Sequence, residues 1–150
     1  MMAVGDSTIL SQYGALPYLI TEQEGIRILL VTTRGRRNWI IPKGWPIRNL
    51  TAAATAAREA YEEAGLVGAI VSDAPLGYFR YQKPGNPRRV TIFEVSVFLF
   101  AVERQLRKWP EKSERETRWF APEEAAALVA PLGLAEILRT AARQILVGAS

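Results

Sequence analysis

Three glutamates lie close together in the stretch AREAYEEAG, which ends at Gly65. The stretch predicts an α-helix, because alanine has the highest helix propensity and the flanking Thr51 and Gly65 suit the two helix ends. At about 100° per residue, Glu59, Glu62 and Glu63 fall on one face of that helix. Clustered carboxylates repel one another, and their oxygens are the ligands that Mg²⁺ and Mn²⁺ prefer. By spacing alone, a divalent metal site and a solvated acidic helix face carry about equal weight.

The same helix has a second stripe, made of alanines and roughly a third of a turn from the acidic face. Its members are Ala53, Ala56, Ala57, Ala60 and Ala64. Small side chains allow a helix to pack closely on its neighbour. The stripe therefore predicts a buried contact whose edge carries the three carboxylates.

The spacing resembles the Nudix box, which reads glycine, five residues, glutamate, seven residues and then R-E-U-x-E-E-x-G-U, with U an aliphatic residue. The residues at the matching offsets are Gly44, Arg58, Glu59, Ala60, Glu62, Glu63, Gly65 and Leu66. Leu50 departs from the pattern, because it stands where the box has its first glutamate.

The resemblance implies a metal-dependent hydrolase that cleaves a diphosphate linkage, with Mg²⁺, or else Mn²⁺, as cofactor. It implies Glu62 and Glu63 as metal ligands, and it leaves Glu59 as either a third ligand or the base that activates water. The carbonyl of Gly44 would help to hold the metal. Arg58 would orient a carboxylate through charge-assisted hydrogen bonds, and a surface ion pair of little energetic value is the alternative. The implied catalytic residues are Glu59, Glu62 and Arg58.

The composition also favours carboxylate and metal chemistry. The 150-residue sequence has no histidine and no cysteine, which excludes histidine-based triads, thiolate nucleophiles and the usual zinc sites. Any general base near neutral pH must then be a carboxylate, a lysine, a tyrosine or a metal-bound water. The formal net charge of +4 favours an anionic partner. We expect a phosphorylated small molecule rather than nucleic acid, since no nucleic-acid-binding module is recognisable.

Several side chains outside the helix are candidates for substrate binding. The guanidinium fork suits bidentate phosphate contacts. The candidate phosphate contacts are Arg34, Arg36, Arg37, Lys43, Arg88 and Arg89, with Arg48 as a weaker one. Candidate stacking rings are Trp39, Trp45 and Trp119, for which a structural role in the core is the alternative. Glu111, Glu114 and Glu116 lie in a region where some Nudix enzymes supply an extra carboxylate, and a solvated surface charge is the alternative for each.

The apolar pattern predicts an α/β fold. Predicted strands cover residues 15–22, 26–33, 39–41, 68–73, 76–82, 90–102 and 115–120, and helices follow at 123–130 and 133–146. Hairpins mixed with crossovers predict a three-layer α/β/α sandwich around a mixed β-sheet, which is the Nudix architecture. The strand at 90–102 is apolar on both faces in its second half, so we expect it to be central. We expect one domain over residues 1–150. No apolar run is long enough for a membrane span and no secretory signal is visible, so we expect a cytoplasmic protein.

Short motifs indicate a branch within the family. The sequences PKGWP, WPE and RWF resemble hydrolases of diphosphoinositol polyphosphates and of dinucleoside polyphosphates. The competing interpretation is a catalytically weak or silent Nudix-fold module that binds a ligand or regulates, and Leu50 is its only support. The non-phosphate half of the substrate, the number of metal ions and the oligomeric state stay open.

Overall fold

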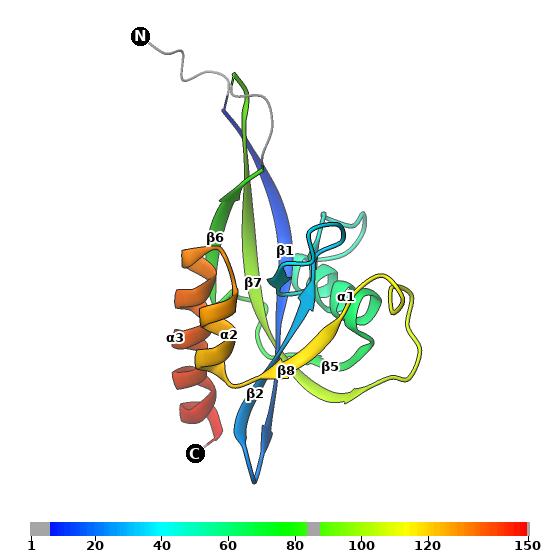
Figure 1. Ribbon diagram of the computed structural model, residues 1–150, viewed down its shortest axis with the longest axis vertical. Helices are drawn as coiled ribbons and strands as arrows, with labels where there is room; N and C mark the ends of the chain where they lie inside the picture. The colour runs from blue at the N-terminus through cyan, green and yellow to red at the C-terminus, as the bar shows by residue number, and fades with distance from the viewer. Residues whose placement is uncertain (1–6, 84–87, 150) are drawn as a thin grey trace.

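A computed structural model describes residues 7–83 and 88–149 and contains a mixed β-sheet (Figure 1). The strands are β1 (Ser7–Thr21), β2 (Gly25–Thr32), β3 (Trp39–Ile40), β4 (Lys43–Gly44), β5 (Leu66–Ile70), β6 (Gly77–Gln82), β7 (Val90–Gln105) and β8 (Thr117–Phe120). The main strand order is β3-β2-β1-β7-β5. The long strands β1 and β7 run parallel, in register from Ser7 with Val90 to Tyr18 with Ala101. All other strand pairs of the described residues are antiparallel, so the predicted mixed sheet is confirmed.

The sheet branches on both sides of the β1–β7 pair, and this branching creates the space for a site. Strand β1 pairs with β4 at Tyr13 and Gly14, and then with β2 from Tyr18 onward. Strand β2 also carries β8, while β7 carries both β5 and β6. The short strand β4 therefore lies beside the middle of β1, immediately before the acidic helix.

Helices cover both sides of the sheet, as expected for three layers. Helix α1 (Ala52–Ala64) packs against β1, β4, β5 and β7. Helices α2 (Pro122–Leu128) and α3 (Leu132–Ala149) pack against each other and against β2, β6 and β8 from the other side (Figure 1).

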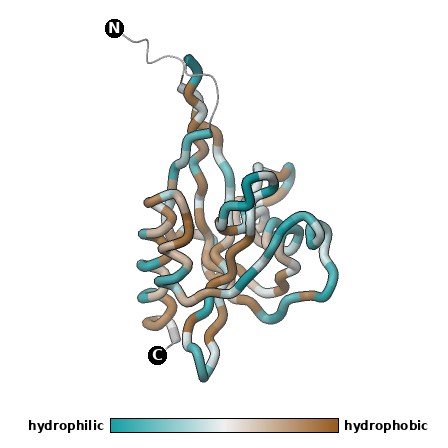
Figure 2. Tube along the Cα trace, in the orientation of Figure 1, coloured by the Kyte–Doolittle hydropathy of each residue, from teal (hydrophilic) through white to brown (hydrophobic). Residues whose placement is uncertain are grey.

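The core lies between these layers, where the apolar segments of the central strands converge (Figure 2). The largest fully buried side chains include Phe98 and Phe100 of β7 and Leu16 of β1. The predicted central position of the strand beginning at Val90 is thereby confirmed. Of the alanine stripe, Ala53, Ala56, Ala60 and Ala64 are buried and Ala57 is partly buried.

Two strands extend beyond their predicted limits. Residues 7–14 form the first half of β1, which was not predicted. Most of these side chains are polar or exposed, so the segment has no strand pattern and the strand depends on pairing with β7. Strand β7 continues to Gln105, three residues past its predicted end, because its exposed end pairs with the start of β5. Other boundaries differ by a few residues.

Candidate active site

Both ends of α1 are fixed by specific caps. The hydroxyl of Thr51 accepts a hydrogen bond from the backbone N–H of Ala54 at 3.1 Å, as predicted for an N-cap. Gly65 ends the helix with φ 67° and ψ 29°, a left-handed conformation that favours glycine. The indole of Trp109 packs on this glycine so closely that an added Cβ would lie 2.3 Å from the ring. The indole N–H also donates to the carbonyl of Glu63 at 3.1 Å, so the loop after β7 holds the end of the helix in place.

Strand β4 approaches the acidic face of α1 at Gly44. A Cβ built on Gly44 would lie 2.4 Å from Oε1 of Glu59. Only glycine therefore allows the β4 backbone to approach this carboxylate without displacing it. This contact places Gly44 next to Glu59.

Glu59 and Glu63 form a carboxylate pair in which Glu63 is buried and Glu59 is half-buried. Glu63 is only 4% exposed, and burial raises the pKa of its carboxyl group to about 9 against the opposing charge of Arg115, while a hydrogen bond with Glu59 adds to the rise. Burial also raises the pKa of Glu59. Arg115 Nε lies 3.8 Å from Oε1 of Glu63. Two desolvated carboxyl groups in contact would gain strongly from a nearby cation.

Glu62 pairs with Arg58 one turn earlier on α1. Its Oε1 accepts a hydrogen bond from Arg58 Nε at 3.2 Å, a contact that fits both an orienting role for Arg58 and a surface ion pair. In residues 7–83 and 88–149, no three acidic side chains are arranged as a ready metal site. A three-carboxylate set requires Glu62 to leave Arg58 and join Glu59 and Glu63. The donors present are all oxygen atoms, and burial raises the pKa of Glu59 and of Glu63, so the residues fit a hard divalent cation.

A cleft of about 510 Å³ opens over these carboxylates; we call it the acidic cleft. Its walls come from β1, β4, α1 and the loops that precede β3 and β8. The lining residues are Gln12, Arg34, Lys43, Gly44, Trp45, Pro46, Ile47, Glu59, Glu62, Glu63, Glu111 and Arg115. Four carboxylates and three cationic side chains thus face one space, which suits a divalent cation together with an anionic ligand.

Glu111 links the two loops at the cleft. Its Oε1 accepts hydrogen bonds from Arg115 Nε at 2.7 Å and from Arg34 at 2.9 Å. Burial favours the protonated form of Glu111, but these two guanidinium groups outweigh it and lower its pKa. The backbone N–H of Glu111 also donates to the carbonyl of Glu62 at 3.0 Å, which attaches this loop to α1.

Only some of the cationic side chains that were predicted to contact phosphate lie at the acidic cleft. Arg34 and Lys43 line the acidic cleft, whereas Arg36 lines a different cavity. Arg37 Nη2 lies 3.9 Å from a carboxylate oxygen of Glu116. Arg88 and Arg89 are exposed before β7 and are not among the residues that line the acidic cleft; the turn that precedes them, at 84–87, lies outside the described residues.

The candidate rings also separate. Trp45 is 50% exposed and lines the acidic cleft. Trp39 packs edge-on against Phe120 and lines the different cavity. Trp119 lies on β8 and lines neither space.

Sequence reasoning missed Gln12 and Arg115 as residues that line the acidic cleft. Arg115 could have been found from its spacing of four after Glu111, whereas Gln12 stands in a segment with no strand pattern.

A second cavity, of about 700 Å³, lies where β3 and β6 meet the turn between α2 and α3; we call it the aromatic cavity. Its walls are mostly apolar. It is lined by Thr33, Arg36, Asn38, Trp39, Ile40, Arg80, Tyr81, Gln82, Lys83, Ala130 and Pro131. Tyr81 separates it from the acidic cleft, because its hydroxyl donates to Gln12 at 2.9 Å and Lys43 Nζ lies 5.0 Å from its ring centroid.

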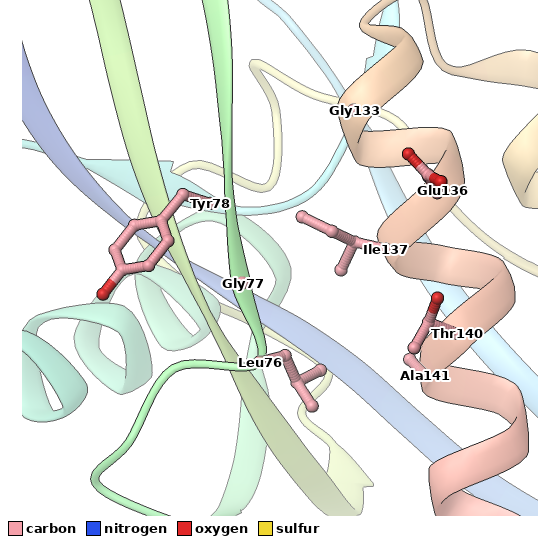
Figure 3. A pocket seen from close by; sticks show the side chains of 8 residues that line it. All are labelled: Leu76, Gly77, Tyr78, Gly133, Glu136, Ile137, Thr140 and Ala141. Atoms are coloured by element: carbon pink, nitrogen blue, oxygen red, sulfur yellow. The ribbon is translucent and has the colours of Figure 1, made fainter.

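A third pocket, of about 240 Å³, lies between β6 and α3 (Figure 3). Tyr78 and Gly77 line it from the strand, and Glu136, Ile137 and Thr140 line it from the helix. It has one carboxylate and no cationic side chain among its lining residues, so it offers neither a metal site nor a phosphate site.

Comparison with known proteins agrees with this geometry. The sequence profile of the NUDIX domain matches residues 12–141. Nudix hydrolase 12, mitochondrial, from Arabidopsis thaliana is 31% identical over 130 residues, which cover 77% of this chain and 64% of that protein. Nudix hydrolase 4 from the same plant is 29% identical over 119 residues, covering 75% and 55%. The chain belongs to the Nudix family. It spans less than two thirds of the length of these relatives.

Solved structures show the same fold. A C. elegans Ap4A hydrolase superposes with a TM-score of 0.66 at 16% identity, covering 92% of this chain and 99% of that one. A Listeria monocytogenes structure titled as a Nudix hydrolase gives a TM-score of 0.64 at 17% identity, covering 91% and 94%. The expected α/β Nudix architecture is therefore confirmed. Among the described residues, no helix is both long and apolar enough to cross a membrane.

Proposed function

We propose that this protein is a divalent-metal-dependent hydrolase that cleaves a diphosphate linkage in a phosphate-rich substrate. The observation that carries the proposal is the buried pair of Glu59 and Glu63, whose carboxyl pKa values are raised by burial at the wall of a cleft that also holds Lys43, Arg34 and Arg115. The carboxylates of such an arrangement suit a divalent cation, and its cationic side chains together with that cation suit a polyphosphate.

Glu59, Glu62 and Glu63 would hold Mg²⁺, or Mn²⁺, with the carbonyl of Gly44. A cation bound there neutralises phosphate oxygens and makes a bound water more acidic. The protein itself supplies positioning and charge. Arg58 would orient Glu62 through its hydrogen bond, and Arg115 limits the repulsion at Glu63.

Lys43 and Arg34 would contact substrate phosphates, which lowers the cost of bringing two anions together at the attacked phosphorus. The chain has no histidine, and carboxylates of the acidic cleft would take the proton from the water that attacks phosphorus. Glu59 and Glu62 are both candidates for that base. Glu111 is a weaker one, since two arginines already engage the same oxygen of its carboxylate.

The two candidate substrate classes make different demands on the aromatic cavity. A diphosphoinositol polyphosphate carries phosphates around its whole ring and needs cations on every side. Three cationic side chains, Arg36, Arg80 and Lys83, line the aromatic cavity. The rest of its wall is largely apolar and carries the rings of Trp39 and Tyr81, which suit the face of a nucleobase. We therefore favour a dinucleoside polyphosphate, with its phosphates in the acidic cleft and one nucleoside in the aromatic cavity.

A substrate panel tests the proposal. Phosphate release would be measured with Mg²⁺ for a dinucleoside tetraphosphate, an inositol pyrophosphate and a nucleotide sugar, each repeated with excess EDTA. We expect EDTA-sensitive cleavage, fastest for the dinucleoside tetraphosphate. Equal rates with and without EDTA would contradict the metal-dependent mechanism, and preference for the inositol pyrophosphate would contradict the substrate assignment.

The silent binding module remains the second candidate, and Leu50 is the observation that favours it. Leu50 is 42% exposed in the turn before α1, so the first box glutamate has no counterpart at this position. Tight binding of one panel compound without any cleavage would select this alternative. A cytoplasmic location and a single domain over residues 1–150 stay predictions.

A further inference from the structure

A buried glutamine joins the acidic cleft to the aromatic cavity. Gln12 lies on β1 and is only 5% exposed. Its Oε1 accepts two hydrogen bonds, from Lys43 Nζ at 3.1 Å and from the Tyr81 hydroxyl at 2.9 Å. Gln12 pairs with Val95 of β7, and Tyr81 pairs with Phe93 two residues away, so both side chains lie on one face of the sheet. One oxygen atom thus fixes donors from two other strands.

Lys43 has neutral partners in its hydrogen bond and in its ring contact, although the charges of Glu63 and Glu59 also act on its ammonium group. Its ammonium group donates to the Gln12 amide and lies 5.0 Å from the centroid of the Tyr81 ring. None of the ion pairs found in residues 7–83 and 88–149 includes Lys43, although Arg34, Arg58 and Arg115 each pair with a glutamate. The charge of Lys43 is therefore still available to a ligand, whereas each of these arginines must first be shared with or released by a carboxylate.

We infer that Gln12, assisted by Tyr81, is a positioning residue that holds the ammonium group of Lys43 at the wall of the acidic cleft for contact with a substrate phosphate. The inference rests on the proposed function in one respect, namely that the cleft receives phosphates. A neutral amide oxygen suits this task, because it fixes the ammonium group by a hydrogen bond without neutralising it. A carboxylate at the same place would form a buried ion pair and remove the charge.

The alternative is that Gln12 is structural and merely satisfies buried donors. The isosteric variant Gln12→Glu separates the two roles, since it keeps the shape and adds a negative charge beside Lys43. Gln23→Glu is the matched control, because Gln23 is exposed in the turn between β1 and β2 and makes the same change of charge far from the cleft. Lys43→Met and the double variant Gln12→Glu/Lys43→Met complete a thermodynamic cycle.

The first readout is the affinity of each variant for inorganic tripolyphosphate with Mg²⁺, measured by calorimetry. We expect Gln12→Glu and Lys43→Met each to weaken binding by at least about tenfold, the loss typical of a charge-assisted hydrogen bond. Gln12→Glu should add no further loss in the Lys43→Met background, because the glutamine acts through the lysine. Gln23→Glu should bind as the unaltered protein does. The second readout is kinetic, and we expect KM to rise more than kcat in Gln12→Glu.

A folded Gln12→Glu variant with unchanged tripolyphosphate affinity would overturn the inference. So would a Gln12→Glu change that weakens tripolyphosphate binding equally in the presence of Lys43 and in the Lys43→Met background. If Gln12→Glu does not fold, Gln12→Met and Tyr81→Phe carry the same cycle, each removing one side of the hydrogen-bond arrangement. A different result would overturn the proposed function. In that case the unaltered protein cleaves no diphosphate, yet the affinity cycle still decides the role of Gln12; absence of tripolyphosphate binding by the unaltered protein overturns both.

Discussion

The acidic cleft and the aromatic cavity lie on either side of Tyr81 and are built in opposite ways. The acidic cleft is rich in charge, and its side chains are joined by ion pairs such as Glu111 with Arg34 and Arg115. The aromatic cavity has mostly apolar walls, and its carboxylate contact, from Arg80 to Glu94, lies on neighbouring strands rather than across the cavity. Under the proposed function, bond cleavage would take place in the acidic cleft and the organic group would be recognised in the aromatic cavity.

The supporting elements differ in the same way. The carboxylates project from a helix whose two ends are capped and whose last turn is bound to the loop of Trp109. The aromatic cavity is formed in part by the loop before β3 and by the turn between α2 and α3. Rigid elements suit chemistry that depends on exact distances, and loops suit recognition that varies between relatives. Changes in the carboxylates of α1 should therefore affect mainly kcat, and changes in the aromatic cavity mainly KM.

The largest expected effect comes from the carboxylates. Glu62→Gln and Glu63→Gln should each lower kcat by at least about 10²-fold, because each removes charge from a site whose electrostatic contribution is several kcal/mol. The measurement is steady-state cleavage at saturating Mg²⁺, with circular dichroism to verify the fold. Near-normal turnover in both variants would mean that the acidic face is only a solvated helix surface.

A smaller loss is expected from Gly44→Ala. The added methyl group would lie 2.4 Å from Oε1 of Glu59, so the carboxylate must move, and we expect kcat to fall by about tenfold or more. Gly148→Ala is the matched control, since a Cβ there meets no atom within 4 Å. Unchanged kcat in Gly44→Ala would show that the close approach of β4 to α1 has no role in the chemistry.

The aromatic cavity should respond in KM. Arg36 lines that cavity, whereas Arg37 pairs with Glu116. We expect Arg36→Ala to raise KM for a dinucleoside tetraphosphate several-fold, with kcat nearly unchanged. This rise corresponds to a loss of roughly 1 kcal/mol of binding free energy. Arg37→Ala should change KM less. The effect of Arg36 should weaken as salt rises, because exposed charges are screened over about 8 Å at physiological ionic strength. Equal changes of KM in Arg36→Ala and Arg37→Ala would mean that lining the aromatic cavity gives Arg36 no special role in substrate binding.

The buried carboxylate pair should also make stability depend on pH when no metal is present. Burial raises the pKa of Glu63 from 4.5 to about 9, so between these values the folded protein holds a proton that the unfolded chain has released. The folded state then binds more protons, and the free energy of unfolding falls as pH rises toward 9. Urea unfolding in EDTA across this range should show the fall, and Glu63→Gln should remove most of it. If the free energy of unfolding fell equally with pH in the unaltered protein and in Glu63→Gln, the raised pKa could not belong to Glu63.

The smallest effect is expected at Leu50. This residue lies outside α1 and is exposed, and Arg58 already has Glu62 as its partner. We expect Leu50→Glu to change kcat/KM by less than about tenfold, or about 1.4 kcal/mol. Rescue from no activity to ordinary turnover would favour the silent module.

The sequence predicted the helix of the carboxylates and its two caps, because these depend on local spacing and on residues with specific conformations, namely Thr51 and Gly65. It also predicted the central strand from its continuous apolar run. It could not predict the first half of β1, where pairing with β7 rather than side-chain pattern forms the strand. Gln12 was missed for the same reason. The turn of Glu62 toward Arg58, away from the other two carboxylates, depends on side-chain rotamers that helical spacing does not determine.

The central claim is that the carboxylates of α1 act through a bound divalent cation. The most direct test is the rate of cleavage of a dinucleoside tetraphosphate as Mg²⁺ is titrated, for the unaltered protein and for Glu63→Gln. We predict a saturable rise from no activity in the unaltered protein, and a curve for Glu63→Gln that is displaced to higher Mg²⁺ and reaches a plateau lower by at least about 10²-fold. The same midpoint and plateau in both proteins, or activity that persists without any divalent cation, would contradict the account.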